Sequence, residues 1–120
     1  MKERGHTKEK LVQIFRDAAS RHFEASLNGD YKKANREAKT IRKTFHLLRE
    51  MGEEGYQALM ILLENEYGAV ATAAAAYLLR YATDAATRVL QRHAQDKGLI
   101  GFESQQALER WREGDWHLDE

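Results

Sequence analysis

Residues 55–79 read GYQALMILLENEYGAVATAAAAYLL, and residues 85–111 read AATRVLQRHAQDKGLIGFESQQALERW. The two stretches resemble each other as an internal repeat of one helix–turn–helix unit. Leu59 matches Val89 and Gly68 matches Gly98, and the residues of each pair are 30 positions apart. Beyond the glycine the second copy is two residues longer. A period near 30, with glycine between two helical patterns, is typical of helical arrays. Such arrays mostly present a surface to another macromolecule, so the repeat favours a binding role.

The composition of the chain predicts an all-α protein. Alanine, leucine, glutamate, lysine and arginine dominate the 120 residues, proline is absent, and no stretch alternates apolar and polar residues at period two. We predict about six helices in a superhelix-like arrangement, forming a single domain over residues 1–120. Its parts are a long helical hairpin over 7–51, helix pairs over 53–82 and 84–113, and an acidic tail over 115–120.

The predicted hairpin has the clearest periodicity in the chain. Thr7 is a candidate N-cap for a first helix, and Asn28-Gly29-Asp30 ends that helix and caps the next. The second helix, residues 31–51, carries apolar residues at spacings of 3, 4, 3, 4 and 3, which places them on one face. This seam consists of Tyr31, Ala34, Ala38, Ile41, Phe45 and Leu48.

The second half of the chain predicts four shorter helices, over residues 53–64, 69–82, 85–97 and 102–113. Alanines in the second of these would let neighbouring helices approach closely. Thr83 or Asp84 is the expected cap of the third, and residues 98–101 are expected to form a turn whose two apolar side chains lie against the core.

The sequence contains no pattern that indicates catalysis or a cofactor. The chain has no cysteine, and its five histidines lack the spacing of a helical zinc site; His22 and His93 fall on apolar faces, which predicts core or boundary positions. Local carboxylate pairs stand at helix ends or in the tail, where capping explains them. We therefore predict no catalytic residue, no bound metal and no cofactor.

The hydropathy of the chain predicts a cytoplasmic location. Residues 1–10 are charged and lack the apolar core of a signal peptide. The longest stretch of low polarity, residues 67–79, is shorter than the ~20 residues that a membrane-spanning helix needs. We expect no membrane partner.

Charge is distributed unevenly along this neutral chain. Residues 1–50 hold 13 Lys and Arg against 7 Asp and Glu, whereas residues 51–120 hold 6 against 12. Opposite the apolar seam of the second helix lie four cations at spacings of 4, 3 and 4, and Glu37 is the only carboxylate between Asp30 and Glu50. This basic stripe is either a binding surface for phosphates or an acidic protein, or the solvated back of an amphipathic helix. It consists of Lys32, Arg36, Lys39 and Lys43.

A second candidate surface is acidic and aromatic. It combines residues from the turn before the fourth helix with residues of the C-terminal tail, and it would meet a basic partner. Trp116 lies beyond the last helix, so it is either a lid that closes the core or an anchor for a partner. The candidate residues are Glu64, Glu66, Tyr67, Asp115 and Trp116.

The whole chain resembles a family of short bacterial HEAT-like helical-repeat proteins of unknown function, some of which are toxin-associated immunity proteins. The elements that carry the resemblance are Leu11 to Met51, Gly55 to Leu63, Val70 to Leu79, Ala86 to Ala94, Ala107 to Trp111 and Leu118-Asp119-Glu120. The chain departs from better HEAT repeats because it lacks their proline and their Asp-x-x-x-Arg pattern.

The resemblance implies a non-enzymatic protein-binding module. Its expected partner is a bacterial toxin domain, which it would neutralise by capping the active site or the substrate groove. The alternative is a nucleic-acid-binding protein that uses the basic stripe, although aromatic side chains that would stack on bases are absent from that face. Two further readings are an enzyme or metal protein built on buried histidines, and a structural or self-associating domain.

Overall fold

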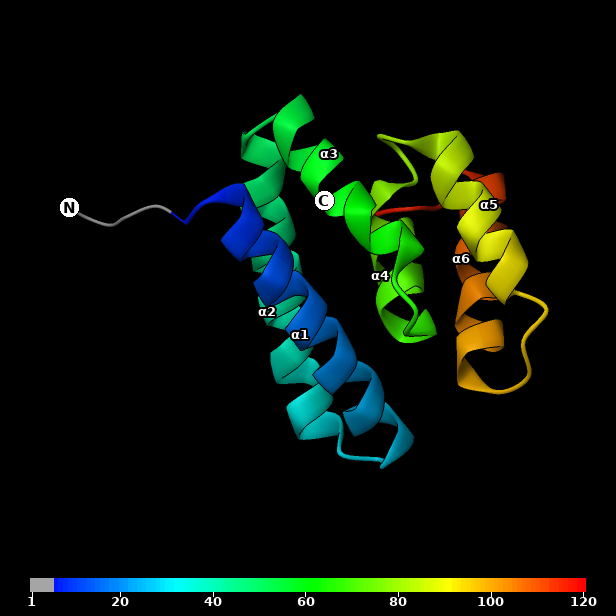
Figure 1. The fold of residues 1–120 in the computed structure, drawn as a ribbon. Coiled ribbons are helices and arrows are strands. Elements are labelled where there is room, and N and C mark those ends of the chain that lie inside the picture. Colours follow the sequence, from blue (N-terminus) through cyan, green and yellow to red (C-terminus); the bar gives the residue numbers. More distant parts are fainter. Residues whose placement is uncertain (1–5) are drawn as a thin grey trace. The chain divides into compact units, whose positions relative to one another are not determined.

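The computed structural model describes residues 6–120, so part of the charged N-terminal segment lies outside it. The described chain consists of helices without a strand, which confirms the all-α prediction (Figure 1). These elements are α1 (Lys8–Leu27), α2 (Tyr31–Glu50), α3 (Glu53–Met60), the short 3-10 helix η1 (Ile61–Glu64), α4 (Gly68–Leu78), α5 (Thr83–His93) and α6 (Leu99–Glu113).

The contacts within the chain divide it into two compact units. Unit 1 comprises residues 1–59 and unit 2 comprises residues 60–120. The boundary falls at the last residue of α3, inside the first of the two predicted helix pairs. That the chain is a single domain, and that its helix pairs belong to the HEAT class, stay predictions.

Unit 1 is dominated by the hairpin of α1 and α2, as predicted (Figure 1). The side chain of Thr7 accepts a hydrogen bond from the backbone N–H of Lys10, and that of Asp30 accepts one from Lys33. Both predicted caps are therefore confirmed. The facing sides of the hairpin bury Leu11, Phe15, Ala18, Ala19, Ala34, Ile41, Phe45 and Leu48.

Two residues of the predicted seam are not buried: Ala38 is half-buried, and Tyr31 is largely exposed. Tyr31 was expected to pack with the apolar face of α2, but its side chain is 70% exposed. Tyr31 is the first residue of α2, directly after the turn, whereas α1 ends at Leu27. The periodic pattern therefore continues past the point where α1 can cover it.

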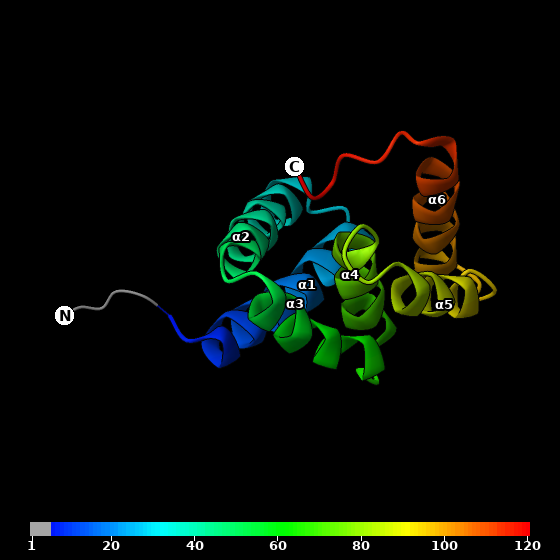
Figure 2. The ribbon, with the colours of Figure 1, turned by 90° about the horizontal axis from the view of Figure 1, so that it is seen from above.

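Unit 2 is built around α4, which packs against η1, α5 and α6, while α5 also packs against α6. Figure 2 shows α5 and α6 inclined to each other, with an extended C-terminal segment leaving the end of α6. The alanines of α4 allow this close packing, as predicted. Fully buried residues include Ala71, Ala74, Ala75, Leu78 and Leu79.

Three local predictions for unit 2 are wrong. First, α4 ends at Leu78 rather than at residue 82. Second, α5 begins at Thr83 with Ala82 in the cap position and no side-chain cap, because the Thr83 hydroxyl donates to the Leu79 carbonyl at 2.6 Å. Third, residues 99–101 form the first turn of α6 instead of a loop.

Two helix ends also differ from the expected bounds. The third helix is α-helical only to Met60 and continues as η1. The fifth helix ends at His93, four residues before its predicted end. Within residues 6–120, no helix combines the length and the apolar character that crossing a membrane requires.

Candidate functional site

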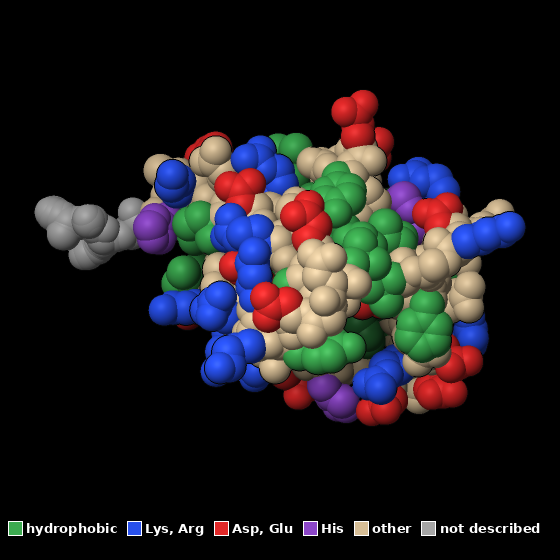
Figure 3. Space-filling view, turned by 90° about the horizontal axis from the view of Figure 1, so that it is seen from below, with side chains coloured by type: hydrophobic (Ala, Val, Ile, Leu, Met, Phe, Trp, Pro, Cys, Tyr) green, Lys and Arg blue, Asp and Glu red, His purple; other side chains and the backbone are tan. Residues whose placement is uncertain are grey.

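The basic stripe lies on the exposed side of α2. Its four residues, Lys32, Arg36, Lys39 and Lys43, are all exposed, and the buried residues of α2 occupy the opposite side. The first and the last are eleven positions apart, which corresponds to about 16 Å along the helix axis. On the face seen in Figure 3, lysine and arginine side chains gather over the part of unit 1 near the N-terminus.

Within the described chain, none of the four side chains of the basic stripe forms an ion pair. Glu37, on the same helix, points to the hairpin interface, where its carboxylate accepts a hydrogen bond from Arg21 Nε at 3.1 Å and its side chain is 12% exposed. The stripe therefore presents uncompensated positive charge to solvent.

His22 of α1 adds no charge to this region at neutral pH. Burial lowers the pKa of its imidazole, and the nearby carboxylate of Glu37 opposes that shift only in part. His22 is half-buried beside the hairpin seam, as the sequence predicted for a boundary residue.

The acidic and aromatic candidate residues do not form one surface. Glu64 and Glu66 are exposed and Tyr67 is the half-buried N-cap of α4, so this group lies at the N-terminal end of that helix. Asp115 is exposed, but Trp116 contacts Arg80, just beyond the C-terminal end of α4. The 11 residues of α4 hold the two groups about 16 Å apart.

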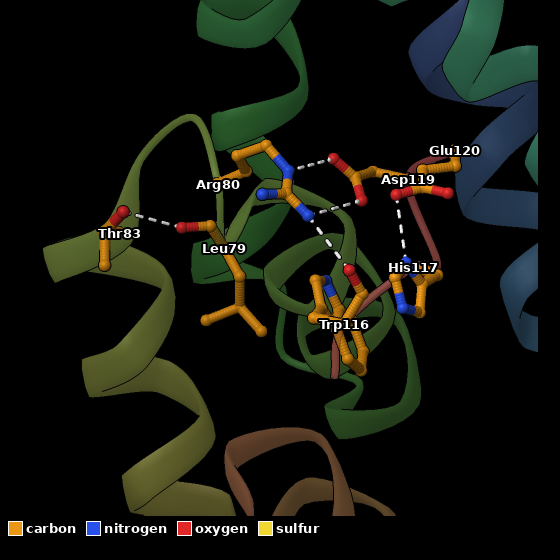
Figure 4. A network of polar contacts seen from close by, with 7 residues as sticks. All are labelled: Leu79, Arg80, Thr83, Trp116, His117, Asp119 and Glu120. Atoms are coloured by element: carbon orange, nitrogen blue, oxygen red, sulfur yellow. Dashed lines mark hydrogen bonds and ion pairs between the residues drawn. The ribbon is translucent and has the colours of Figure 1, made fainter. Parts of the chain in front are cut away.

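The C-terminal segment is held by a group that sequence reasoning missed. Arg80 donates from Nε to Asp119 Oδ2 at 2.7 Å and from Nη2 to Asp119 Oδ1 at 3.4 Å, and Nη2 also donates to the Trp116 carbonyl at 3.0 Å (Figure 4). The guanidinium carbon lies 5.6 Å from the ring centroid of Trp111. We call these four residues the C-terminal clasp.

The clasp buries a carboxylate and an indole ring. Asp119 is 2% exposed and Trp116 is 9% exposed. Burial raises the pKa of Asp119, but the hydrogen bonds and the charge of Arg80 oppose it, and the net pKa is lowered. The carboxylate is therefore ionised at neutral pH. Trp116 closes the core of unit 2, so its ring is not on the surface that a partner would meet.

A sequence signal for the clasp exists. Arg80 is the only charged residue between Glu66 and Asp84, at the end of an alanine-rich helix. A lone arginine in such a stretch needs a partner, and Leu118-Asp119-Glu120 supplies it. Spacing alone could not pair two residues that are 39 positions apart.

The exposed part of the C-terminal segment carries a second, weaker cluster. His117 lies 3.0 Å from Glu120 and 3.3 Å from Asp115, measured between ring nitrogens and carboxylate oxygens. The hydrogen bond and the charge of Glu120 raise the pKa of His117, with a smaller contribution from Asp115. Because all three side chains are exposed, these contacts contribute little to stability.

The remaining histidines do not converge on a site. His93 is half-buried and its Nδ1 lies 2.9 Å from Asp96 Oδ2, within the turn between α5 and α6. His46 lies on α2, in the other unit. In the part of the chain that the structure describes, no three His, Asp or Glu side chains are arranged to hold a metal ion.

Comparisons with known proteins bear on the fold. No protein-family model matches the sequence, and no curated protein matches it. The structure is similar to the crystal structure of the protein RPA1889 from Rhodopseudomonas palustris CGA009, with a TM-score of 0.84 and 20% sequence identity, over 92% of this chain and 93% of that chain. The chain therefore shares its helical fold with a bacterial protein.

Proposed function

We propose that this protein is a non-enzymatic protein-binding module whose basic stripe docks on an acidic surface of its partner. The observation that carries the proposal is the set of four exposed cations on one face of α2, none of them in an ion pair within the described residues. A surface of one sign steers a complementary partner and accelerates association. The same surface repels partners of like charge, which gives specificity.

The helix that carries the basic stripe is rigid, which suits a docking surface. α2 spans 20 residues, is capped by Asp30 and is packed along its length on α1. Its cations are thus spaced by a rigid helix, so docking orders only their side chains. The charges of unit 2 are mixed in sign: the exposed arginines of α6, Arg110 and Arg112, lie between Glu109 and Glu113, and Asp84 stands one turn before Arg88 on α5.

The partner class follows from the resemblance to bacterial immunity proteins. In this proposal the partner is a toxin domain with an acidic rim around its active site or substrate groove. Binding of the hairpin over that rim inhibits the toxin sterically, without chemistry. The proposal needs no metal and no cofactor on this chain.

The test begins with affinity capture of the intact protein from the cells that produce it, followed by identification of a stoichiometric partner and its expression alone to score toxicity. Association with the purified partner is then measured for a variant carrying Lys32→Glu, Arg36→Glu, Lys39→Glu and Lys43→Glu. A matched control changes four exposed arginines of unit 2, Arg88, Arg92, Arg110 and Arg112, to Glu, which alters net charge equally.

Reversal of the stripe should lower the association rate by about 10- to 100-fold at low salt, and the difference should shrink as salt is added. The control variant should change the rate much less. If the stripe variant and the wild type bind the partner equally at every salt concentration, the proposal is wrong. Tighter binding to duplex or single-stranded nucleic acid than to any protein would favour the alternative function.

A further inference from the structure

Two partly exposed apolar side chains stand at the C-terminal end of the basic stripe. Leu47 of α2 and Met51, the C-cap residue that follows α2, are each 38% exposed. Met51 keeps right-handed helical backbone angles, so the two residues are four positions apart on one helical path and are neighbours on its surface. We call this pair the apolar end.

The apolar end continues the row of the basic stripe. Leu47 comes four positions after Lys43, just as Lys43 comes four positions after Lys39, and this spacing places side chains on one face of a helix. Leu47 does not belong to the buried seam. It precedes the fully buried Leu48, and successive helical residues are about 100° apart around the axis. The exposed face of α2 is therefore positive along the stripe and apolar where the stripe ends.

One carboxylate of α2 lies on the same face. Glu50, the last residue of α2, is exposed and comes seven positions after Lys43, which is about two helical turns. It is three positions from Leu47, so it lies beside the apolar end and not among the cations. The charge of this face thus changes sign where the apolar end begins.

The spacing of the cations matches a helical partner. Successive cations of the stripe are about 6, 4.5 and 6 Å apart along the axis, because each residue of an α-helix rises about 1.5 Å. A second helix with carboxylates at spacings of 4, 3 and 4 repeats these rises, so all four charge pairs form in one register. Alternate residues of an extended strand rise about 6.6–6.8 Å, so its carboxylates fall about 3–4 Å out of step over the stripe.

We propose that the basic stripe and the apolar end form one docking surface for an acidic amphipathic helix of the partner protein. This inference rests on the proposed function and adds the secondary structure and the register of the partner. Carboxylates at spacings of 4, 3 and 4 meet the cations, and an apolar residue one turn beyond them meets Leu47 and Met51. Glu50 repels a further carboxylate at that end, so the acidic row of the partner stops there.

The test uses three synthetic 20-residue peptides on an alanine and glutamine framework, which favours helix. The first carries glutamates at spacings of 4, 3 and 4, followed four positions later by a leucine, and the second carries the same row in reverse order for antiparallel docking. These two are the row peptides. The third has the same composition, but its glutamates are spread around the helix. Circular dichroism checks that the three peptides are equally helical, and fluorescence anisotropy measures their binding to the full-length protein.

Affinities are measured for the wild type, for the stripe variant, in which the four cations are glutamate, and for an apolar-end variant with Leu47→Gln and Met51→Gln. Glutamine is a good helix former, so the apolar-end variant should keep α2 intact, which circular dichroism checks. The matched control is Leu27→Gln with Tyr31→Gln. It removes two more exposed apolar side chains, 60% and 70% exposed, from the turn between α1 and α2.

At least one row peptide should bind the wild type at least about tenfold more tightly than the third peptide. The apolar-end variant should bind that row peptide at least about fivefold more weakly, whereas the control should bind it like the wild type. Row peptides that bind no better than the third peptide, or that bind the apolar-end variant as tightly as the wild type, would overturn this inference. The proposed function stands in that case if the stripe variant has lost the binding.

Two other results would overturn both proposals. If the stripe variant binds the three peptides as the wild type does, the stripe does not attract acidic surfaces. If a labelled oligo-dT binds the wild type more tightly than either row peptide, the stripe binds phosphates instead of carboxylates.

Discussion

Gly101 should tolerate no side chain, because the backbone of the preceding turn occupies the space. A Cβ placed on Gly101, in the first turn of α6, would lie far inside van der Waals contact with the carbonyl oxygen of Asp96. The clash is with backbone, so a rotamer change cannot relieve it. Relief requires the turn between α5 and α6 to move.

That turn is held on both sides. Its Asp96 side chain lies 2.9 Å from His93 Nδ1, and Gln105 Nε2 donates to the Ala94 carbonyl at 2.7 Å. Forced shifts of a packed backbone cost about 1–3 kcal/mol. The two contacts that hold the turn between α5 and α6 place the cost of its shift at the upper end of that range. Replacing glycine with alanine in a helix returns up to about 1 kcal/mol. We therefore expect Gly101→Ala to lower the free energy of unfolding by about 2 kcal/mol.

Urea unfolding followed by tryptophan fluorescence measures this change in the right place, because Trp111 and Trp116 both lie in unit 2. The control is Gly114→Ala, where the backbone φ is +78° and no atom lies within 4 Å, so only about 1 kcal/mol of backbone strain is expected. Removing the pin with Gln105→Ala should reduce the cost of Gly101→Ala in a double-mutant cycle. A Gly101→Ala cost no larger than that of the control would refute the steric argument.

Three further outcomes follow from buried polar groups. Ser104 is fully buried, and its hydroxyl has no hydrogen-bond partner within residues 6–120. Ser104→Ala should therefore stabilise unit 2 by up to about 1 kcal/mol in the same urea assay. A loss of stability would show that the hydroxyl is hydrogen-bonded. The pKa of His22 in the folded chain is lowered from 6.5, so as pH falls the unfolded chain binds a proton at this residue before the folded chain does. The free energy of unfolding should therefore decline as pH falls below 6.5. His22→Gln should flatten that slope in urea titrations followed by circular dichroism. The pKa of Asp119 is lowered from 3.8, so the clasp should stabilise the fold at neutral pH and release as pH falls through the still lower folded-state value. In an acid titration of tryptophan fluorescence, Asp119→Asn should abolish that step, and an unchanged step would assign it elsewhere.

The elements that were predicted well are those whose signals are local. The 3-4 spacing of apolar residues defined α2, and the two caps, Thr7 and Asp30, act within three residues of themselves. Such patterns depend only on helix geometry, so they are readable without knowledge of the packing. The prediction that Tyr31 is buried was wrong for the same reason. Periodicity assigns a residue to a face of its helix, but it does not show where the neighbouring helix ends.

The features that were missed depend on long-range contacts or on close packing. Gly101 was assigned to a turn, yet it lies in the first turn of α6, where the Asp96 carbonyl occupies the space that a Cβ would need. The clasp joins Arg80 to Asp119 across 39 positions. The acidic and aromatic candidates were grouped by composition, and the structure separates Tyr67 from Trp116 by the length of α4.

The two units differ in how their charged side chains are compensated. Many charged groups of unit 2 are used within the fold: Asp119 is bound by Arg80, and Asp96 by His93. Its exposed arginines on α6, Arg110 and Arg112, lie between Glu109 and Glu113, so the fields of these opposite charges cancel over a short distance in salt. Within residues 6–120 the basic stripe has neither kind of compensation, because Glu37 lies toward the hairpin interface and is bound by Arg21. An uncompensated row of like charges opposes folding through its own repulsion. Under the proposed function, an acidic partner would offset that repulsion.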